Sequence, residues 1–64
     1  MSYVVFVDAK LSSGTWVIMS RLPQNGDYIT RTEAVAQAKR NIAEWKRMRT
    51  RIKYLEWRSR IRKV

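Results

Sequence analysis

The chain contains no cysteine and no histidine, and its 64 residues include one proline and two glycines. Without cysteine there is no disulfide or thiol nucleophile, and without either residue the usual zinc ligands are missing. Domains this small bury a modest core and usually need a disulfide, a metal or a second subunit for stability. We therefore expect a single small domain over residues 1–64, with no cofactor and no metal, that forms a homodimer.

Acidic residues are also few. The five carboxylates are scattered along the chain, at Asp8, Asp27, Glu33, Glu44 and Glu56. Their positions show no pairing of the kind that two-carboxylate catalysis requires. The sequence has no Gly-rich phosphate loop and no metal-binding motif. We therefore predict no catalytic residue and no enzymatic activity.

Long apolar runs are missing as well. No stretch approaches the roughly 18 apolar residues that span a bilayer. The first five residues lack the positive region and the apolar run of a signal peptide. These absences predict an intracellular, cytoplasmic protein without a transmembrane segment.

Positive charge, by contrast, is in large excess and is concentrated at one end of the chain. The formal net charge is +9. Residues 1–30 carry two basic and two acidic residues, whereas residues 46–64 carry nine basic residues and one acid, Glu56. Six of these nine are arginines, whose planar guanidinium groups match phosphate oxygens. Like charges at this density repel one another in a compact protein, which favours an anionic partner.

We predict that these nine basic residues contact nucleic acid, with DNA favoured over RNA. They are Lys46, Arg47, Arg49, Arg51, Lys53, Arg58, Arg60, Arg62 and Lys63. Three alternatives remain open. The segment could be a solvated face, it could dock on an acidic surface of a partner protein as part of an interaction module, inhibitor or adaptor, or it could lie on an anionic membrane surface.

The first 30 residues are predicted to form a β-hairpin or meander. Residues 3–7 are β-branched and aromatic, and residues 15–20 follow the turn-forming residues 12–14 as an antiparallel partner strand. Asn25-Gly26 predicts a second turn, and residues 27–29 a short third strand. Four aromatic residues of this region are assigned to the core: Tyr3, Phe6, Trp16 and Tyr28.

A helix is predicted to begin at Arg31. Thr30 can act as its N-cap, with Glu33 three residues later completing a capping box. No glycine or proline follows, so the helix is expected to continue to the C-terminus, with a bend over residues 49–51 as an alternative. Five residues at helical spacing form the face expected to pack on the sheet: Ala34, Val35, Ala38, Ile42 and Trp45.

The distal half of such a helix extends beyond a small sheet, because short strands cover only about half of it. It is therefore expected to pack against another subunit through four residues: Met48, Ile52, Leu55 and Trp57. A second alternative is that residues 50–54 and 60–62 form strands, since apolar and basic residues alternate there. Residues 55–57 interrupt this alternation.

The entry to the second strand, Gly14-Thr15-Trp16-Val17, and the helix start, Thr30-Arg31-Thr32-Glu33-Ala34, follow an order that resembles the AP2/integrase arm-binding domains. The resemblance covers residues 3–47. It implies a small ββ(β)α fold that binds DNA through basic and polar side chains on the open sheet face, where the predicted strands offer Lys10 and Arg21. In size and composition the chain also resembles accessory proteins of phages and mobile elements.

The predicted fold class is α+β. We expect a small antiparallel sheet of two or three strands within residues 1–30, followed by a long basic helix over residues 31–64. The predicted function is non-enzymatic nucleic-acid binding.

Overall fold

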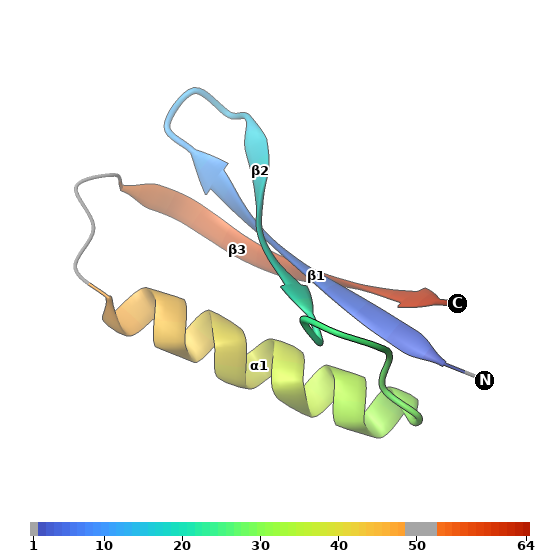
Figure 1. Cartoon of the computed structure of the whole chain (residues 1–64). Helices are drawn as coiled ribbons and strands as arrows, with labels where there is room; N and C mark the ends of the chain where they lie inside the picture. Colours follow the sequence, from blue (N-terminus) through green and yellow to red (C-terminus); the bar gives the residue numbers. More distant parts are fainter. Residues whose placement is uncertain (1, 49–52) are drawn as a thin grey trace.

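The computed structural model describes residues 2–48 and 53–64. These residues form four elements, which are β1 (Tyr3–Leu11), β2 (Trp16–Leu22), α1 (Arg31–Arg47) and β3 (Tyr54–Lys63). The strands make one antiparallel sheet in the order β2-β1-β3, and α1 lies along one side of it (Figure 1). The predicted α+β class is confirmed, with the first strand of the chain at the centre of the sheet.

The predicted hairpin is present and joins β1 to β2. The backbone N–H of Leu11 donates to the carbonyl of Thr15 at 2.9 Å, and the N–H of Gly14 donates to the carbonyl of Leu11 at 2.9 Å. Gly14 has φ of 89°, a left-handed conformation that glycine adopts without a steric penalty. Gly26, in the second predicted turn, has φ of 79° for the same reason.

Residues 27–29 do not form the predicted third strand. Tyr28 makes an isolated bridge to Tyr3, with backbone hydrogen bonds of 2.8 Å in each direction. The chain then turns into α1 at Thr30. A three-residue segment flanked by a turn and a helix start is too short to continue the ladder, so the pairing stops after one residue.

The helix begins as predicted. The hydroxyl of Thr30 accepts a hydrogen bond from the backbone N–H of Glu33 at 3.2 Å, which satisfies one of the free donors of the first turn. Ala34 and Ala38 are fully buried against Val5 and Val7 of β1. Ile42 and Trp45 pack against the same cluster. Small residues on the inner face of α1 therefore let the helix lie close to the sheet.

The helix ends at Arg47, so the prediction that it continues to residue 64 is wrong. Residues 54–63 form β3, which pairs with β1 along its whole length. The strand alternative was the better interpretation of this region, although it placed the strands at residues 50–54 and 60–62. The physical reason is that β1, buried at the centre, needs a ladder partner on each side for its backbone groups. A strand also buries Ile61 and Trp57 against the core.

A β-bulge explains why residues 55–57 interrupt the alternation. Lys10 pairs with Glu56, but Leu11 pairs with Tyr54, so Leu55 is an extra residue in β3. The bulge shifts the alternation by one position, and β3 therefore runs without a break.

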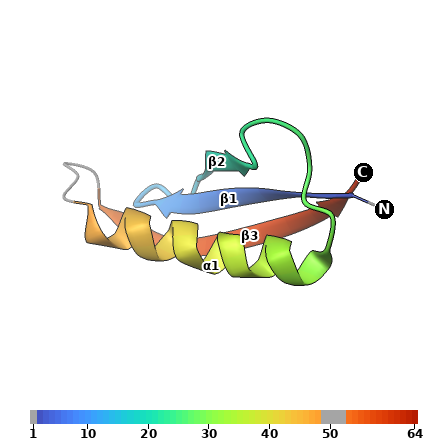
Figure 2. The same cartoon turned by 60° about the horizontal axis from the view of Figure 1, so that its bottom comes forward.

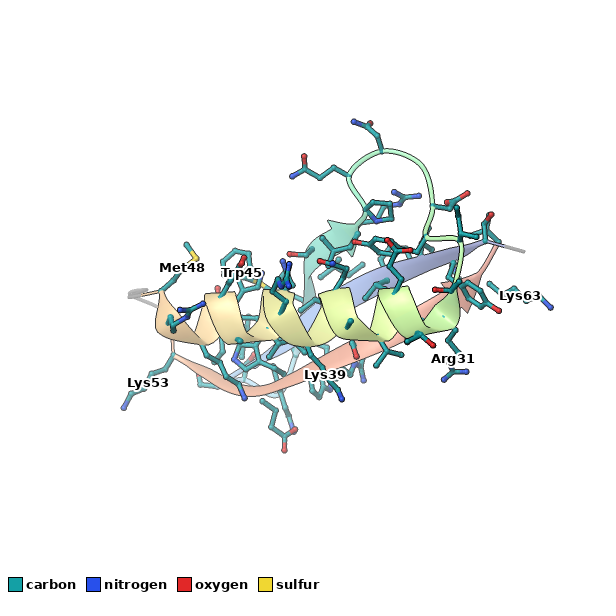
Figure 3. The ribbon with its side chains drawn as sticks, turned by 90° about the horizontal axis from the view of Figure 1, so that it is seen from below. Arg31, Lys39, Trp45, Met48, Lys53 and Lys63 are labelled. Carbon is teal, nitrogen blue, oxygen red and sulfur yellow. The ribbon has the colours of Figure 1, made fainter. Side chains whose placement is uncertain are left out.

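The four predicted interface residues do not form one surface. Trp57 stacks on Trp45 inside the molecule, with ring centroids 6.0 Å apart. Met48 follows the end of α1 and is 57% exposed, near Trp45 in Figure 3. Ile52 and the side chain of Leu55 lie outside the part of the chain that the structure describes. The overlong helix that motivated the homodimer is replaced by β3, and the homodimer stays a prediction.

Candidate nucleic-acid interface

The sheet has two faces with different chemistry. Val5 and Val7 of β1 point toward α1, so their neighbours in the strand point to the opposite side. Among the described residues, no helix or strand covers this opposite side (Figure 2). We call it the open face. The strand pairing assigns to it Val4, Phe6, Asp8 and Lys10 of β1, Trp16, Ile18 and Arg21 of β2, and Glu56, Arg58, Arg60 and Arg62 of β3.

Three arginines of β3 lie on the open face. They alternate with Ser59 and Ile61, so the strand period of two places them all on one side. Arg58 is paired with Asp8, Arg60 with Phe6 and Arg62 with Val4. Three of the residues predicted to bind nucleic acid are therefore brought together by the sheet rather than by a helix.

Asp8 is the polar centre of this face. It is 1% exposed, although no backbone layer covers it, because the side chains of Arg58 and Arg60 close over it. The Nε atom of Arg60 donates to Oδ2 of Asp8 at 2.6 Å, and its Nη2 donates to Oδ1 at 3.2 Å. The Nε atom of Arg58 donates to Oδ2 at 2.9 Å. One carboxylate thus fixes two guanidinium groups.

The charge state of Asp8 follows from these contacts. Burial raises the pKa of the Asp8 carboxyl, but hydrogen bonds and charge from Arg60 and Arg58 outweigh burial and lower the pKa below its ordinary value of 3.8. Asp8 is therefore ionised at neutral pH, and both arginines keep their ion pair.

The same two arginines also pack on aromatic rings of the sheet. The Cζ atom of Arg58 lies 4.0 Å from the ring centroid of Trp16, and the Cζ atom of Arg60 lies 5.2 Å from that of Phe6. These are cation–π distances. Phe6 and Trp16 were assigned to the core, which is wrong, because the hairpin register turns both away from α1 and leaves them half-buried.

The open face has the same balance of basic and acidic residues as α1. It carries five basic residues, which are Lys10, Arg21, Arg58, Arg60 and Arg62, against the two acids Asp8 and Glu56. The helix mixes both signs, with Arg31, Glu33, Lys39, Arg40, Glu44, Lys46 and Arg47. The open face therefore differs from α1 in arrangement and not in net charge, because three of its arginines lie in one row on β3.

The other predicted binding residues lie elsewhere. Lys46 and Arg47 are exposed in the last turn of α1, in the other layer of the fold. Lys53 and Lys63 are exposed near the two ends of β3 (Figure 3). Arg49 and Arg51 lie outside the described residues.

Sequence reasoning missed the role of Asp8, which was treated as an isolated acid. The available signal was the alternation along β1, because Phe6, Asp8 and Lys10 are two residues apart and so share one side of a strand. The two arginine partners of Asp8 could not be identified from the sequence, because their position depends on residues 54–63 being a strand. These partners are Arg58 and Arg60.

Two further findings concern metal ions and membranes. Within residues 2–48 and 53–64, no group of three or more acidic side chains lies together in a way that could hold a metal ion. The one described helix, α1, is neither long enough nor apolar enough to cross a membrane.

The chain was compared with known proteins. No family model, no curated protein and no solved structure matches it. The order of elements, ββαβ, also differs from the ββ(β)α order that the resemblance to arm-binding domains implied.

Proposed function

We propose that the protein binds double-stranded DNA through the open face of its sheet and catalyses no reaction. The observation that supports this most directly is the row formed by Arg58, Arg60 and Arg62 on one exposed side of β3. Lys10 and Arg21 extend the positive surface over the other two strands. Three of the nine basic residues that the sequence singled out belong to this proposed surface, and a strand presents them instead of a helix.

The size of the sheet favours the major groove of B-form DNA. Strands lie about 4.8 Å apart, so the outer two strands are separated by about 10 Å. The major groove is about 12 Å wide and admits a helix or a β-ribbon. The major groove of A-form RNA is narrow and deep, and side chains do not reach its bases. Duplex DNA therefore fits the open face better than duplex RNA.

The arrangement of the rings favours a duplex over a single strand. Proteins that bind single strands present free aromatic faces on which bases stack. Here Arg58 covers Trp16 and Arg60 covers Phe6. A base would have to displace these arginines, and with them the ion pairs to Asp8, before it could stack. The open face is thus better suited to hydrogen bonding than to stacking.

Electrophoretic shift assays over a salt series test the proposal. We expect duplex DNA to bind more tightly than single-stranded DNA or RNA of equal length. If about four phosphates are contacted, the logarithm of the association constant should fall with the logarithm of salt concentration with a slope of about −4. Binding that does not change with salt would contradict the proposal.

A matched pair of charge reversals locates the surface. Arg62→Glu alters the open face, whereas Arg40→Glu makes the same change in charge on the exposed side of α1. We expect Arg62→Glu to weaken duplex binding by at least about tenfold and Arg40→Glu by much less, because contact with phosphate decides the effect. Equal losses in both variants would indicate attraction by net charge alone.

One observation favours a second candidate function, docking on an acidic protein surface. Ile18 is 63% exposed and lies on the open face, paired with Asp8. Exposed apolar residues inside a charged surface are common in protein interfaces. The two functions differ in one simple measurement. If the natural partner is DNA, protein purified at low salt should carry material that absorbs at 260 nm and is removed by nuclease.

A further inference from the structure

We propose that Arg58 is the residue that contacts a base, that the base is a guanine in the major groove, and that Asp8 is its positioning residue. This inference rests on the proposed DNA binding and adds to it a preference for duplexes that contain guanine. Arg60, although it lies next to Arg58 and shares the same carboxylate, is assigned a structural role.

The first argument concerns the hydrogen-bond donors of Arg58 that Asp8 does not occupy. Arg58 contacts Asp8 through Nε alone, at 2.9 Å. Within the described residues, no hydrogen bond or ion pair joins its two terminal nitrogens, Nη1 and Nη2, to another group. Those nitrogens form the end of the guanidinium fork and can bind two acceptors side by side. The side chain of Arg58 is 45% exposed, so a ligand can reach them.

Arg60 differs in this respect. It donates to both oxygens of Asp8, from Nε at 2.6 Å and from Nη2 at 3.2 Å. This bidentate contact occupies one side of its fork and leaves Nη1 as the unpaired nitrogen among the described contacts. Arg60 therefore holds the carboxylate in place, and the carboxylate in turn holds Arg58.

The second argument is rigidity. The guanidinium of Arg58 is fixed at Nε by Asp8 and lies 4.0 Å from the ring centroid of Trp16. Contact with a ring face restrains the guanidinium plane but leaves the in-plane N–H donors free to bind. An arginine that is already ordered loses little side-chain entropy when it binds, which favours selective contact over loose attraction to phosphate.

The third argument is position. Arg58 starts on the edge strand β3, bonds to Asp8 on the central strand β1, and reaches Trp16 on the far strand β2. Its fork is thus held over the middle of the sheet. When a sheet enters a groove, its middle faces the base edges and its margins face the phosphates. Arg62, toward the C-terminal end of β3, has no such contact among the described hydrogen bonds and is assigned to phosphate.

Guanine is the base that fits the fork. In the major groove it presents two adjacent acceptors, N7 and O6, which match two parallel N–H donors. Adenine presents an acceptor beside a donor, and cytosine presents a donor. A fixed, doubly donating fork therefore discriminates in favour of guanine.

The test compares three duplexes of equal length that contain guanine, 7-deazaguanine or only A·T pairs. The analogue keeps base pairing and the minor groove but removes the N7 acceptor. We expect the protein to bind the guanine duplex at least about tenfold more tightly than the A·T duplex, with 7-deazaguanine losing most of that preference. Equal affinity for all three would overturn the inference while leaving DNA binding intact. Failure to bind any duplex would instead refute the proposed function.

Variants assign the preference to one side chain. Arg58→Lys keeps the charge but removes the fork, so it should abolish the preference for guanine while changing affinity for the A·T duplex by less than about threefold. Arg62→Lys is the matched control on the same strand and should keep the preference. If Arg58→Lys weakens binding to all three duplexes equally, Arg58 contacts phosphate and the inference is wrong.

Asp8→Asn tests the positioning role. It removes the negative charge that fixes Arg58 but makes the protein more positive. We expect this variant to bind the A·T duplex at least as tightly as the wild type and to lose most of its preference for guanine. A merely structural role predicts a parallel loss for every duplex, and that result would contradict positioning. Urea unfolding of each variant confirms that folded protein is compared.

Discussion

The Nε atom of Arg58 lies 2.9 Å from Oδ2 of Asp8, and this contact connects the first strand of the chain to the last across 50 residues of sequence. Arg60 makes the same connection two residues later. The carboxylate is buried, whereas both arginine side chains remain 45% exposed. The ion pair therefore stabilises the sheet and also orders the surface that we propose for DNA binding.

Replacing Asp8 should destabilise the fold. Asp8→Ala leaves two neighbouring guanidinium groups without their shared acceptor, and we expect a loss of about 1–3 kcal/mol in the free energy of unfolding. Water can hydrate the half-exposed arginines, which keeps the loss below the value for a fully buried pair. Urea unfolding measures the change. Glu56→Ala is the control. The Oε2 atom of Glu56 lies 3.9 Å from Nζ of Lys10, and the Glu56 side chain is 62% exposed. Its removal should therefore lower the free energy of unfolding by no more than about 0.5 kcal/mol.

Stability should depend on Asp8 at low pH. Its pKa in the folded protein lies below the ordinary value of 3.8, so the ionised form is favoured by folding. The resulting stabilisation is fully present above that ordinary value and is lost as the pH falls through the lower folded pKa. Unfolding midpoints of wild type and Asp8→Asn, measured from about pH 7 to about pH 2, should therefore converge in acid. A constant difference over the whole range would contradict this assignment.

The close contact between α1 and the sheet should not tolerate a larger residue at Ala38. Ala38 is 1% exposed and packs in the cluster with Val5 and Val7. Ala38→Leu should cost about 1–3 kcal/mol, because added methyl groups force the helix away from the sheet. Ala43→Leu, on the exposed side of the same helix, should change the free energy of unfolding by no more than about 0.5 kcal/mol. Thermal unfolding followed by circular dichroism gives both values.

Removal of β3 should abolish the folded state. A chain that ends at Met48 keeps the hairpin and α1 but leaves one edge of β1 unpaired and uncovers the side of the core that Trp57 and Ile61 fill. We expect no cooperative unfolding transition for this truncated chain. If residues 54–63 were instead an appended helix, the truncated chain would still unfold cooperatively.

Local signals along the chain predicted the hairpin and the start of the helix well. The turn glycines and the Thr30 cap act within a few residues, so they can be recognised without knowledge of the rest of the fold. The small inner residues of α1 were predicted for the same reason, since their spacing depends only on the helical period.

The end of the helix could not be predicted in this way. Arginine and lysine favour helices, and no glycine or proline marks a stop after Arg47. The strand over residues 54–63 exists because β1, about 50 positions earlier, offers a free edge, and this is a tertiary effect. The candidate site could not be predicted without the pairing between β1 and β3. The sequence identified Arg58, Arg60 and Arg62 as candidates, but their meeting with Asp8 required the register between β1 and β3.

The central place of β1 has a consequence for the time at which the protein folds. This strand is synthesised before β2, α1 and β3, yet one of its two neighbours in the sheet is β3, the last of these four elements. Until β3 leaves the ribosome, β1 is paired on one side only and the carboxylate of Asp8 lacks its two arginine donors. Contacts between such distant segments slow folding and extend the period in which apolar strands are exposed. We expect most of the folding to follow the synthesis of β3.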